Sequence, residues 1–180
     1  MLQEAGPPLT YFPAGMVVGA GSESYKTLRY LVARLPVIIA PASLRNASQP
    51  IAAADAVAYP VGALEKEATV GREIEIGGLD RLSYGEKLDW LAIALGRAPP
   101  PADPRTRSHP RLSSLWIGLV TPVDAGVARP LIESDAVPTG VRDEGGMALF
   151  PEIEPVGFDQ ALRRALEEGA EAGGGRTAAQ

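Results

Sequence analysis

Apolar and polar positions change between strand-like and helix-like periods along residues 7–96. The stretch PPLTYFPAGMVVG, residues 7–19, is apolar and partly β-branched, which predicts a buried strand that leads into a glycine-rich loop. In the following ESYKTLRYLVARL, the apolar residues that share one helical face are Tyr25, Leu28, Leu31, Val32 and Leu35. Ser22 or Ser24 can cap this helix, and Pro36 ends it.

The next stretch continues the alternation. VIIA, residues 37–40, is a short strand candidate, and residues 41–50 predict a loop because they are rich in proline, serine and asparagine. Residues 51–67 have helical composition, and Pro60 is expected to kink the helix. The apolar positions at i, i+4 and i+7 of this helix are Val57, Val61 and Leu64.

Two more elements follow before residue 96. GREIEIGG alternates isoleucine with glutamate, which is typical of a strand with one face in water. Ser83 and Glu86 have the spacing of a capping box, and the helix that they begin closes at Gly96. Since strands and helices alternate, the sequence predicts an α/β fold.

Composition divides the chain into four parts. Residues 1–96 carry the α/β alternation, and the proline-rich residues 97–112 predict a linker. Residues 113–169 predict a mostly helical lobe, which ends in an amphipathic helix that starts at Phe158. Residues 170–180 predict a disordered tail.

Charge and cysteine content exclude several functions. The 180-residue chain has a net charge of −5, so it offers no positive field for nucleic acid. It has no cysteine, which excludes disulfides, thiolate nucleophiles and cysteine-zinc sites. No leader pattern and no apolar run of about 18 residues occurs, so we expect a cytoplasmic protein without a membrane partner.

The glycines of VVGAGSES begin like a dinucleotide-binding loop, but the rest of that fingerprint is missing. The third small position is Ser24, and Pro13 lies in the preceding strand candidate. The acidic residue expected about 20 residues later is also missing, since the next carboxylate is Asp55. The pattern therefore disfavours a phosphate loop here.

A search for catalytic groups finds little. His109 is the only histidine, so a multi-histidine metal site is excluded and no metal site is predicted. A tyrosine with a lysine one helical turn later would form a proton-transfer pair, but Tyr25, Tyr59 and Tyr84 have no such lysine. The catalytic residues therefore stay unknown.

Four stretches together resemble a known family. They are LTYFPAGMVVGAGSESYKTLRYLVARLPVIIAP, SQPIAAADAVAYPVGALE, GREIEIGGLDRLSYGEKLDWLA and PRLSSLWIGLVTPVDAGVARPLIES. In this order they resemble the C-terminal half of the atypical and extended short-chain dehydrogenase/reductase family, in its nucleoside-diphosphate-sugar-epimerase-like, NAD(P)-binding branch. The resemblance implies the C-terminal part of a Rossmann-like fold with a small substrate lobe.

The resemblance also implies where a ligand site would lie. The positions that match the cofactor side are Phe12, Pro13, Ala14, Val17, Gly19 and Gly21. Those that match the substrate side are Tyr25, Arg29, Arg45, Gln49, Pro50 and Ile51. NAD(P) is the implied cofactor, and its loss is an open alternative.

The family's glycine-rich turn and catalytic tyrosine-lysine helix would precede residue 1, because Leu2 matches the middle of the family's fold. The resemblance therefore predicts a truncated NAD(P)-binding oxidoreductase or epimerase that is not an autonomous dehydrogenase. It also predicts exposed strand edges, and with them a homo-oligomer or a separately encoded partner.

Two alternatives stay open. One is a nucleotide-independent isomerase or cyclase that acts on a small molecule. Its candidate residues are Tyr11, Tyr25, Arg29, Arg45 and Asp55. The other is a non-catalytic interaction module.

Overall fold

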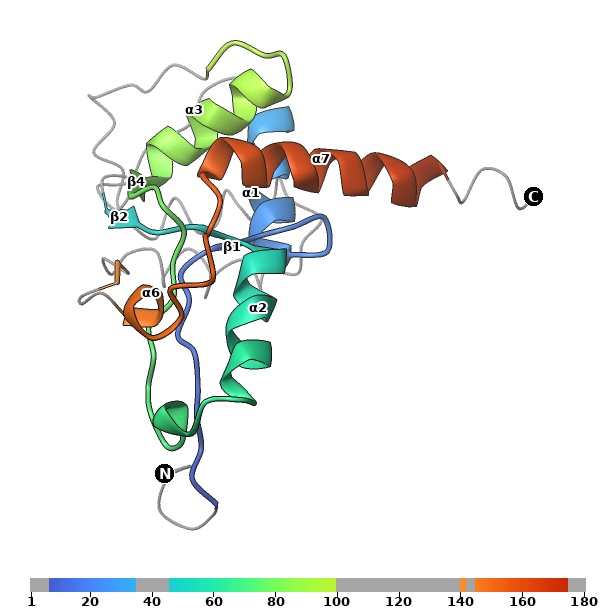
Figure 1. The fold of residues 1–180 in the computed structure, drawn as a ribbon. Coiled ribbons are helices and arrows are strands. Elements are labelled where there is room, and N and C mark those ends of the chain that lie inside the picture. Colours follow the sequence, from blue (N-terminus) through green and yellow to red (C-terminus); the bar gives the residue numbers. More distant parts are fainter. Residues whose placement is uncertain (1–6, 35–45, 100–139, 142–144, 175–180) are drawn as a thin grey trace.

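The protein is a mixed helix and strand structure in which helices surround short extended segments (Figure 1). A computed structural model describes residues 7–34, 46–99, 140–141 and 145–174. Its strands are β1 (Val17–Val18), β2 (Ala47–Ser48), β3 (Ile51–Ala52) and β4 (Leu82–Ser83). Its helices are α1 (Glu23–Arg34), α2 (Ala53–Ala63), the short 3-10 helix η2 (Glu67–Thr69), α3 (Tyr84–Ala94), α6 (Gly145–Leu149) and α7 (Phe158–Gly174). The α/β class predicted from the alternation is confirmed at this level.

The extended segment 10–18 lies in the middle of the parallel arrangement and pairs with both of the other parallel segments. Its end, β1, pairs in parallel with β3, in the register Val17 to Ile51. Its start forms parallel bridges with the segment 73–76, one of which joins Ala14 to Ile76. The strand predicted at residues 7–19 therefore exists as an extended segment that pairs on both sides, and its regular part is short.

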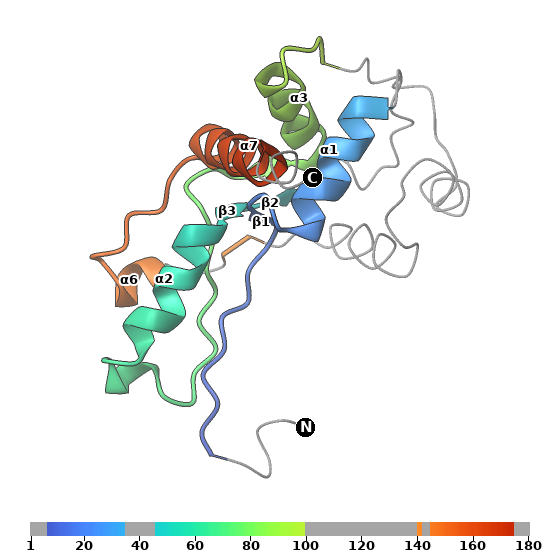
Figure 2. The same cartoon turned by 90° about the vertical axis from the view of Figure 1, so that its right-hand side faces the viewer.

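Side-chain alternation along β1 and β3 separates two cores. Val18 and Ala52 face the helices α1, α3 and α7, whereas Val17 and Ile51 face α2 and α6. In both views α1, α3 and α7 lie together at the top of the molecule, and α2 and α6 lie below β1 and β3 (Figures 1 and 2). We call the two clusters the upper core and the lower core.

The upper core is built by three amphipathic helices. Its buried residues are Met16, Val18, Tyr25, Leu28, Leu31, Val32, Ala52, Leu82, Leu88, Leu91, Ala92, Phe158, Ala161, Leu162 and Ala165. The predicted apolar faces of α1 and α7 are therefore confirmed for the described residues, and Leu35 lies outside them. The α7 helix continues to Gly174, beyond its expected end at Gly169, because Ala170, Glu171 and Ala172 favour helix. The first five residues of the expected tail are thus helical.

The lower core is smaller and aromatic. Its buried residues are Ile51, Tyr59, Ile74, Ile76 and Phe150. Phe12 joins them, with ring centroids 6.5 Å from Tyr59 and 6.3 Å from Phe150. Tyr59 and Phe150 meet edge to face at 5.5 Å, a favourable aromatic geometry. The isoleucines of GREIEIGG are buried as the alternation predicts.

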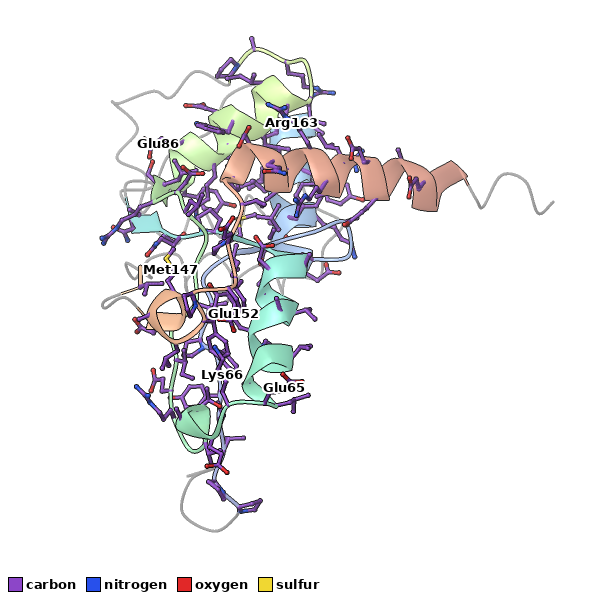
Figure 3. All side chains as sticks on the ribbon, in the orientation of Figure 1. Glu65, Lys66, Glu86, Met147, Glu152 and Arg163 are labelled. Carbon is purple, nitrogen blue, oxygen red and sulfur yellow. The ribbon has the colours of Figure 1, made fainter. Side chains whose placement is uncertain are left out.

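Lys66 lies against the lower core and bonds to the chain around Phe150. The Lys66 ammonium donates to the Leu149 carbonyl oxygen at 2.7 Å and forms an ion pair with Glu152 at 2.7 Å. It also lies 4.5 Å from the centre of the Phe150 ring. Figure 3 shows Lys66 and Glu152 in the lower half of the molecule, beside α2. One side chain therefore ties the end of α2 to the segment that follows α6.

The helix predicted over residues 51–67 is shorter than expected. Ile51 and Ala52 form β3, α2 covers Ala53–Ala63, and Pro60 lies inside it. Tyr59 is the buried residue of α2, and Ala56 and Ala63 pack beside it on the lower core. The predicted apolar face lies away from this side, with Val57 61%, Val61 59% and Leu64 86% exposed.

The antiparallel strands β2 and β4 form a second small sheet beside α3. The predicted capping box is present, since Ser83 accepts from the Glu86 amide while the Glu86 carboxylate accepts from the Ser83 amide. Gly96 follows α3 at a φ of 68°, as expected for a closing glycine. The strand expected at residues 37–40 and most of the expected linker and helical lobe lie outside the described residues.

Candidate functional site

Segment 10–18 and the segment 73–76 end at glycines, and the chain that enters β3 packs against the second of these ends. In open α/β sheets, ligands bind at the carboxyl ends of the strands. We call these residues the strand-end cluster: Gly19, Gln49, Pro50, Gly77 and Gly78. Gly19 follows β1, the segment 49–50 leads into β3, and the glycine pair follows the segment 73–76.

Glycine is required at these positions because the segments approach closely. A Cβ atom on Gly78 would lie 2.2 Å from the Pro50 carbonyl oxygen, which is a backbone atom and cannot move aside. A Cβ atom on Gly77 would lie 2.8 Å from the Gln49 Cβ atom, and one on Gly19 would lie 2.8 Å from the Ala53 Cβ atom. The cluster is therefore a packed backbone junction.

Gln49 stabilises this junction with two side-chain hydrogen bonds. Its Nε2 donates to the Gly78 carbonyl oxygen at 3.3 Å, and its Oε1 accepts from the Val141 amide at 2.7 Å. Both ends of the side-chain amide are therefore used by the protein itself. The substrate-side position that the resemblance implied at Gln49 is, in this structure, a link between three segments.

The glycine loop after β1 is a helix cap. The Ser22 amide donates to the Gly19 carbonyl oxygen at 3.0 Å, and the Ser22 hydroxyl donates to the Val17 carbonyl oxygen at 2.6 Å. The same hydroxyl accepts from the Tyr25 amide at 3.4 Å. Of the two serines that could cap α1, Ser22 is therefore the cap.

A carboxylate of the protein lies at the N-terminus of α1. The Ala20 amide, in the middle of the glycine loop, donates to Oε2 of Glu168 on α7 at 3.3 Å. In a dinucleotide-binding loop such amides would face a pyrophosphate. Here the positive end of the helix already has an anion, which would repel a second one. This geometry agrees with the sequence argument against a phosphate loop.

Tyr25 and Arg29 lie apart from the strand-end cluster. Tyr25 is buried in the upper core, and its hydroxyl has no hydrogen-bond partner among the described residues. Burial raises the pKa of Tyr25, the Arg29 charge lowers it in part, and the Glu168 charge raises it. Arg29 is exposed on the outer side of α1. These two residues therefore sit on the upper core and α1, and Ile51 lies in the lower core.

Tyr59 is another buried tyrosine whose hydroxyl has no hydrogen-bond partner in the part of the chain that the structure describes. Its pKa is raised by burial first and then by the nearby Asp55 carboxylate. Gly146 of α6 packs on this ring, where a Cβ atom would lie 2.7 Å from Tyr59 Cε1. The closed packing explains why the hydroxyl meets no donor or acceptor.

The cofactor-side positions divide between two places. Phe12 and Val17 pack on the lower core, and Gly19 belongs to the strand-end cluster. Ala14 and Gly21 are exposed, and a Cβ atom on Gly21 would meet nothing within 4 Å. The Pro13 carbonyl oxygen accepts from the Ile76 amide at 2.9 Å. Arg45 and His109 lie outside the described residues.

The residues of the isomerase alternative do not form one site. The exposed Tyr11 hydroxyl donates to the Glu73 carboxylate at the far end of segment 10–18, and this hydrogen bond raises the pKa of Tyr11. Asp55 accepts from the Val156 amide at 2.8 Å, and Asp80 accepts in the same way from the Phe158 amide at 2.7 Å. These two carboxylates hold the chain that enters α7, so Asp55 has a structural role.

Lys87 is a buried charged residue, of a kind often found at functional sites, that the sequence analysis did not identify. Its side chain is fully buried, and its ammonium donates to the Ser48 hydroxyl at 2.6 Å. The pair joins α3 to β2. A signal was present in the sequence, because Lys87 lies four residues before Leu91 on the apolar side of α3, where a lysine is unexpected.

The described residues hold no group of three or more histidine, cysteine, aspartate or glutamate side chains that could bind a metal ion. Within the same residues, no helix has the length and apolar character to cross a membrane. No protein-family model matches the chain, and no curated protein matches it either.

Proposed function

We propose that this chain is the substrate-side part of an NAD(P)-dependent oxidoreductase or epimerase of the short-chain dehydrogenase kind, and that it does not transfer hydride by itself. The observation that carries the proposal is the parallel arrangement of β3 and the segment 73–76 with segment 10–18, in which segments 10–18 and 73–76 end at glycines of the strand-end cluster. The connection from β1 through α1 to the parallel β3 is a strand–helix–strand unit, and such units bind small molecules at the carboxyl ends of their strands.

The residues present do not fit the pyrophosphate of such a cofactor. Glu168 accepts the Ala20 amide at 3.3 Å, which is where phosphate oxygens would have to bind. Near the strand ends the surroundings are instead uncharged: they consist of backbone groups, the Gln49 amide, which is bonded at both ends within the protein, and apolar side chains such as the partly buried Val17. Uncharged groups of this kind suit a ring or a sugar better than a phosphate.

The non-catalytic module is the second candidate, and it is favoured by the backbone groups of Phe12 and Ala14, which have no hydrogen bond among the described residues. The nucleotide-independent isomerase has less support, because Tyr11, Tyr25 and Asp55 are dispersed over the exposed end of the strand, the upper core and the α7 tether.

Ligand fragments test the proposal on the purified chain. Nicotinamide riboside is expected to shift the amide NMR signals of Gly19, Gly77 and Gly78, whereas adenosine monophosphate is expected to leave them in place. NADH and NADPH titrations, followed by cofactor fluorescence with light scattering on the same sample, should give no saturable binding to the monomer.

The variant Glu168→Gln is the control for the α1 N-terminus. If the carboxylate excludes phosphate, this variant should gain weak adenosine monophosphate binding near Ala20 without changing the riboside shifts. Saturable NADPH binding by the wild-type monomer would show that the chain holds a complete cofactor site. Riboside shifts that avoid the strand-end cluster would overturn the assignment of the ligand site.

A further inference from the structure

The loop that follows the segment 73–76 carries an arginine without a partner. After the glycine pair of the strand-end cluster, this loop continues through residues 79–81 to β4. Arg81 is exposed, and among the described residues its guanidinium makes no hydrogen bond and no ion pair. A cation is therefore available in the loop at the carboxyl end of a parallel segment, where open α/β sheets bind their ligands.

Gly140 fixes the position of this guanidinium. A Cβ atom on Gly140 would lie 3.2 Å from the Arg81 Cζ atom and 3.3 Å from both its Nε and Nη2 atoms. Because three atoms of the group are almost equally close, its flat face covers Gly140. The N–H donors of a guanidinium lie in its plane, so this stacking leaves the edge of the group open to an acceptor.

The segment 140–141 joins Arg81 to the strand-end cluster. The Val141 amide donates to the Gln49 Oε1 atom at 2.7 Å, and a Cβ atom on Gly77 would lie 3.0 Å from Val141 Cγ2. Gly140, which the guanidinium covers, precedes Val141 in the chain. The guanidinium therefore lies at the rim of the uncharged backbone junction.

The two residues before Arg81 differ in role. The Asp80 carboxylate accepts from the Phe158 amide at 2.7 Å, so it is bonded to the start of α7. Leu79 is 59% exposed and offers an apolar surface between the glycine pair and Arg81. The loop therefore presents an apolar side chain and a cation beside the strand-end cluster.

We infer that Arg81 binds the anionic group of this chain's ligand, and that the ligand is a small organic acid whose uncharged part lies on the strand-end cluster. Two N–H donors in one plane match the two oxygens of a carboxylate, and such bidentate pairs combine charge with geometry. The inference rests on the ligand site of the proposed function and names the class of substrate that this site accepts.

A carboxylate fits this place better than a phosphate. Phosphate groups are commonly bound by the amides of a helix N-terminus. At α1 this position is taken, because the Ala20 amide donates to the Glu168 carboxylate at 3.3 Å. Arg81 supplies one positive charge, which equals the single negative charge of a carboxylate.

Benzoate and benzamide test the inference on the purified chain, because they share a ring and differ in charge. At constant ionic strength, benzoate should shift the amide NMR signals of Gly78, Arg81 and Gly140 saturably. Its Kd should be about tenfold lower than that of benzamide, as expected for hydrogen bonds to a charged group. Arg81→Gln keeps a planar group without the charge, so its Kd for benzoate should rise by about tenfold, to the benzamide value.

Arg164→Gln is the matched control. Arg164 is exposed on α7, has no partner among the described residues and carries the same charge, so this variant should bind benzoate as the wild type does. Equal affinity for the two probes, an unchanged Kd in Arg81→Gln, or an equal loss in Arg164→Gln would each overturn the inference. The absence of any saturable shift near Gly78 and Arg81 would overturn it as well.

Nicotinamide riboside separates this inference from the proposed function. Arg81→Gln should leave the riboside shifts at Gly19 and Gly77 unchanged, since the riboside has no carboxylate. Riboside shifts at the strand-end cluster, together with benzoate binding that does not depend on Arg81, would overturn the inference alone. Benzoate binding that depends on Arg81, in a chain that does not respond to the riboside, would support the acid site and overturn the NAD(P)-linked function.

Discussion

The upper and lower cores differ in how completely they are covered. In the upper core, α3 packs against α1 and α7, α1 packs on β1, and α7 packs on β1 and β3, so that all three helices bury their apolar faces in one cluster. The lower core is covered by α2 and α6, but Val57 and Val61 of α2 are exposed, and the backbone groups of Phe12 and Ala14 have no hydrogen bond among the described residues. The comparison indicates that stability is concentrated in the upper core, which buries more apolar side chains than the lower core.

The largest expected effect comes from breaking the upper core. Leu91 is fully buried between the helices, so Leu91→Ala should lower the free energy of unfolding by about 2–5 kcal/mol. Urea unfolding followed by circular dichroism measures this loss.

Phe150→Ala is the matching change in the lower core. It should speed hydrogen exchange at Ile74 and Ile76 while the amides of α3 keep most of their protection. Equal loss of protection in both cores would contradict the comparison.

The strand-end cluster joins the two cores, and its glycines come next. Gly78→Ala would force a Cβ atom to within 2.2 Å of the Pro50 carbonyl oxygen, so we expect a loss of about 3 kcal/mol, the upper end of overpacking costs. Gly21→Ala is the control, since its Cβ atom meets nothing within 4 Å. It should be neutral or stabilise by roughly 0.5 kcal/mol. Similar thermal unfolding of the two variants would show that the junction is not tightly packed.

The upper core was predictable from sequence because its signal is local. The spacing of Leu28, Leu31 and Val32 and the Ser83–Glu86 capping box each lie within one helix, and the structure confirms them. Which face of α2 is buried was not predictable in the same way. Val57, Val61 and Leu64 have a typical buried pattern, but Tyr59 and two alanines face the core instead, because Phe12 and Phe150 leave room there for a ring.

The candidate site was predictable only in part, because long-range contacts decide it. Gln49 contacts the glycine pair Gly77 and Gly78, but Gly19 packs on Ala53 instead, and Tyr25 belongs to the upper core. The bond from Ala20 to Glu168 joins residues 148 positions apart, and no spacing rule reveals such a pair. The same holds for the bonds that Asp55 and Asp80 make to the chain before and at the start of α7.

The buried pair of Lys87 and Ser48 tests whether polar contacts also hold the upper region. Ser48→Ala removes an acceptor 2.6 Å from a buried ammonium, so a loss of about 2 kcal/mol is expected for a bond to a charged group. Ser48→Thr keeps the hydroxyl and should restore most of the stability in urea unfolding. If Ser48→Ala unfolds at the wild-type urea concentration, the lysine does not depend on this serine.

The smallest effect concerns the start of α3, which leads into the upper core. Ser83→Ala removes the cap and should cost about 1 kcal/mol at neutral pH. Hydrogen bonds from the Ser83 hydroxyl, and then from its amide, lower the pKa of Glu86 below the ordinary 4.5. A lowered pKa in the folded protein stabilises it above pH 4.5, and this contribution disappears as the pH falls through the folded value. The difference between wild type and Ser83→Ala should therefore shrink between neutral pH and about pH 3 in urea unfolding.

Glu86→Gln is the control, because it keeps an acceptor but cannot titrate, and its stability relative to wild type should improve over the same interval. A constant difference for Ser83→Ala across this range would mean that the carboxylate takes no part in the cap, and that α3 is held by the burial of Leu88 and Leu91 alone.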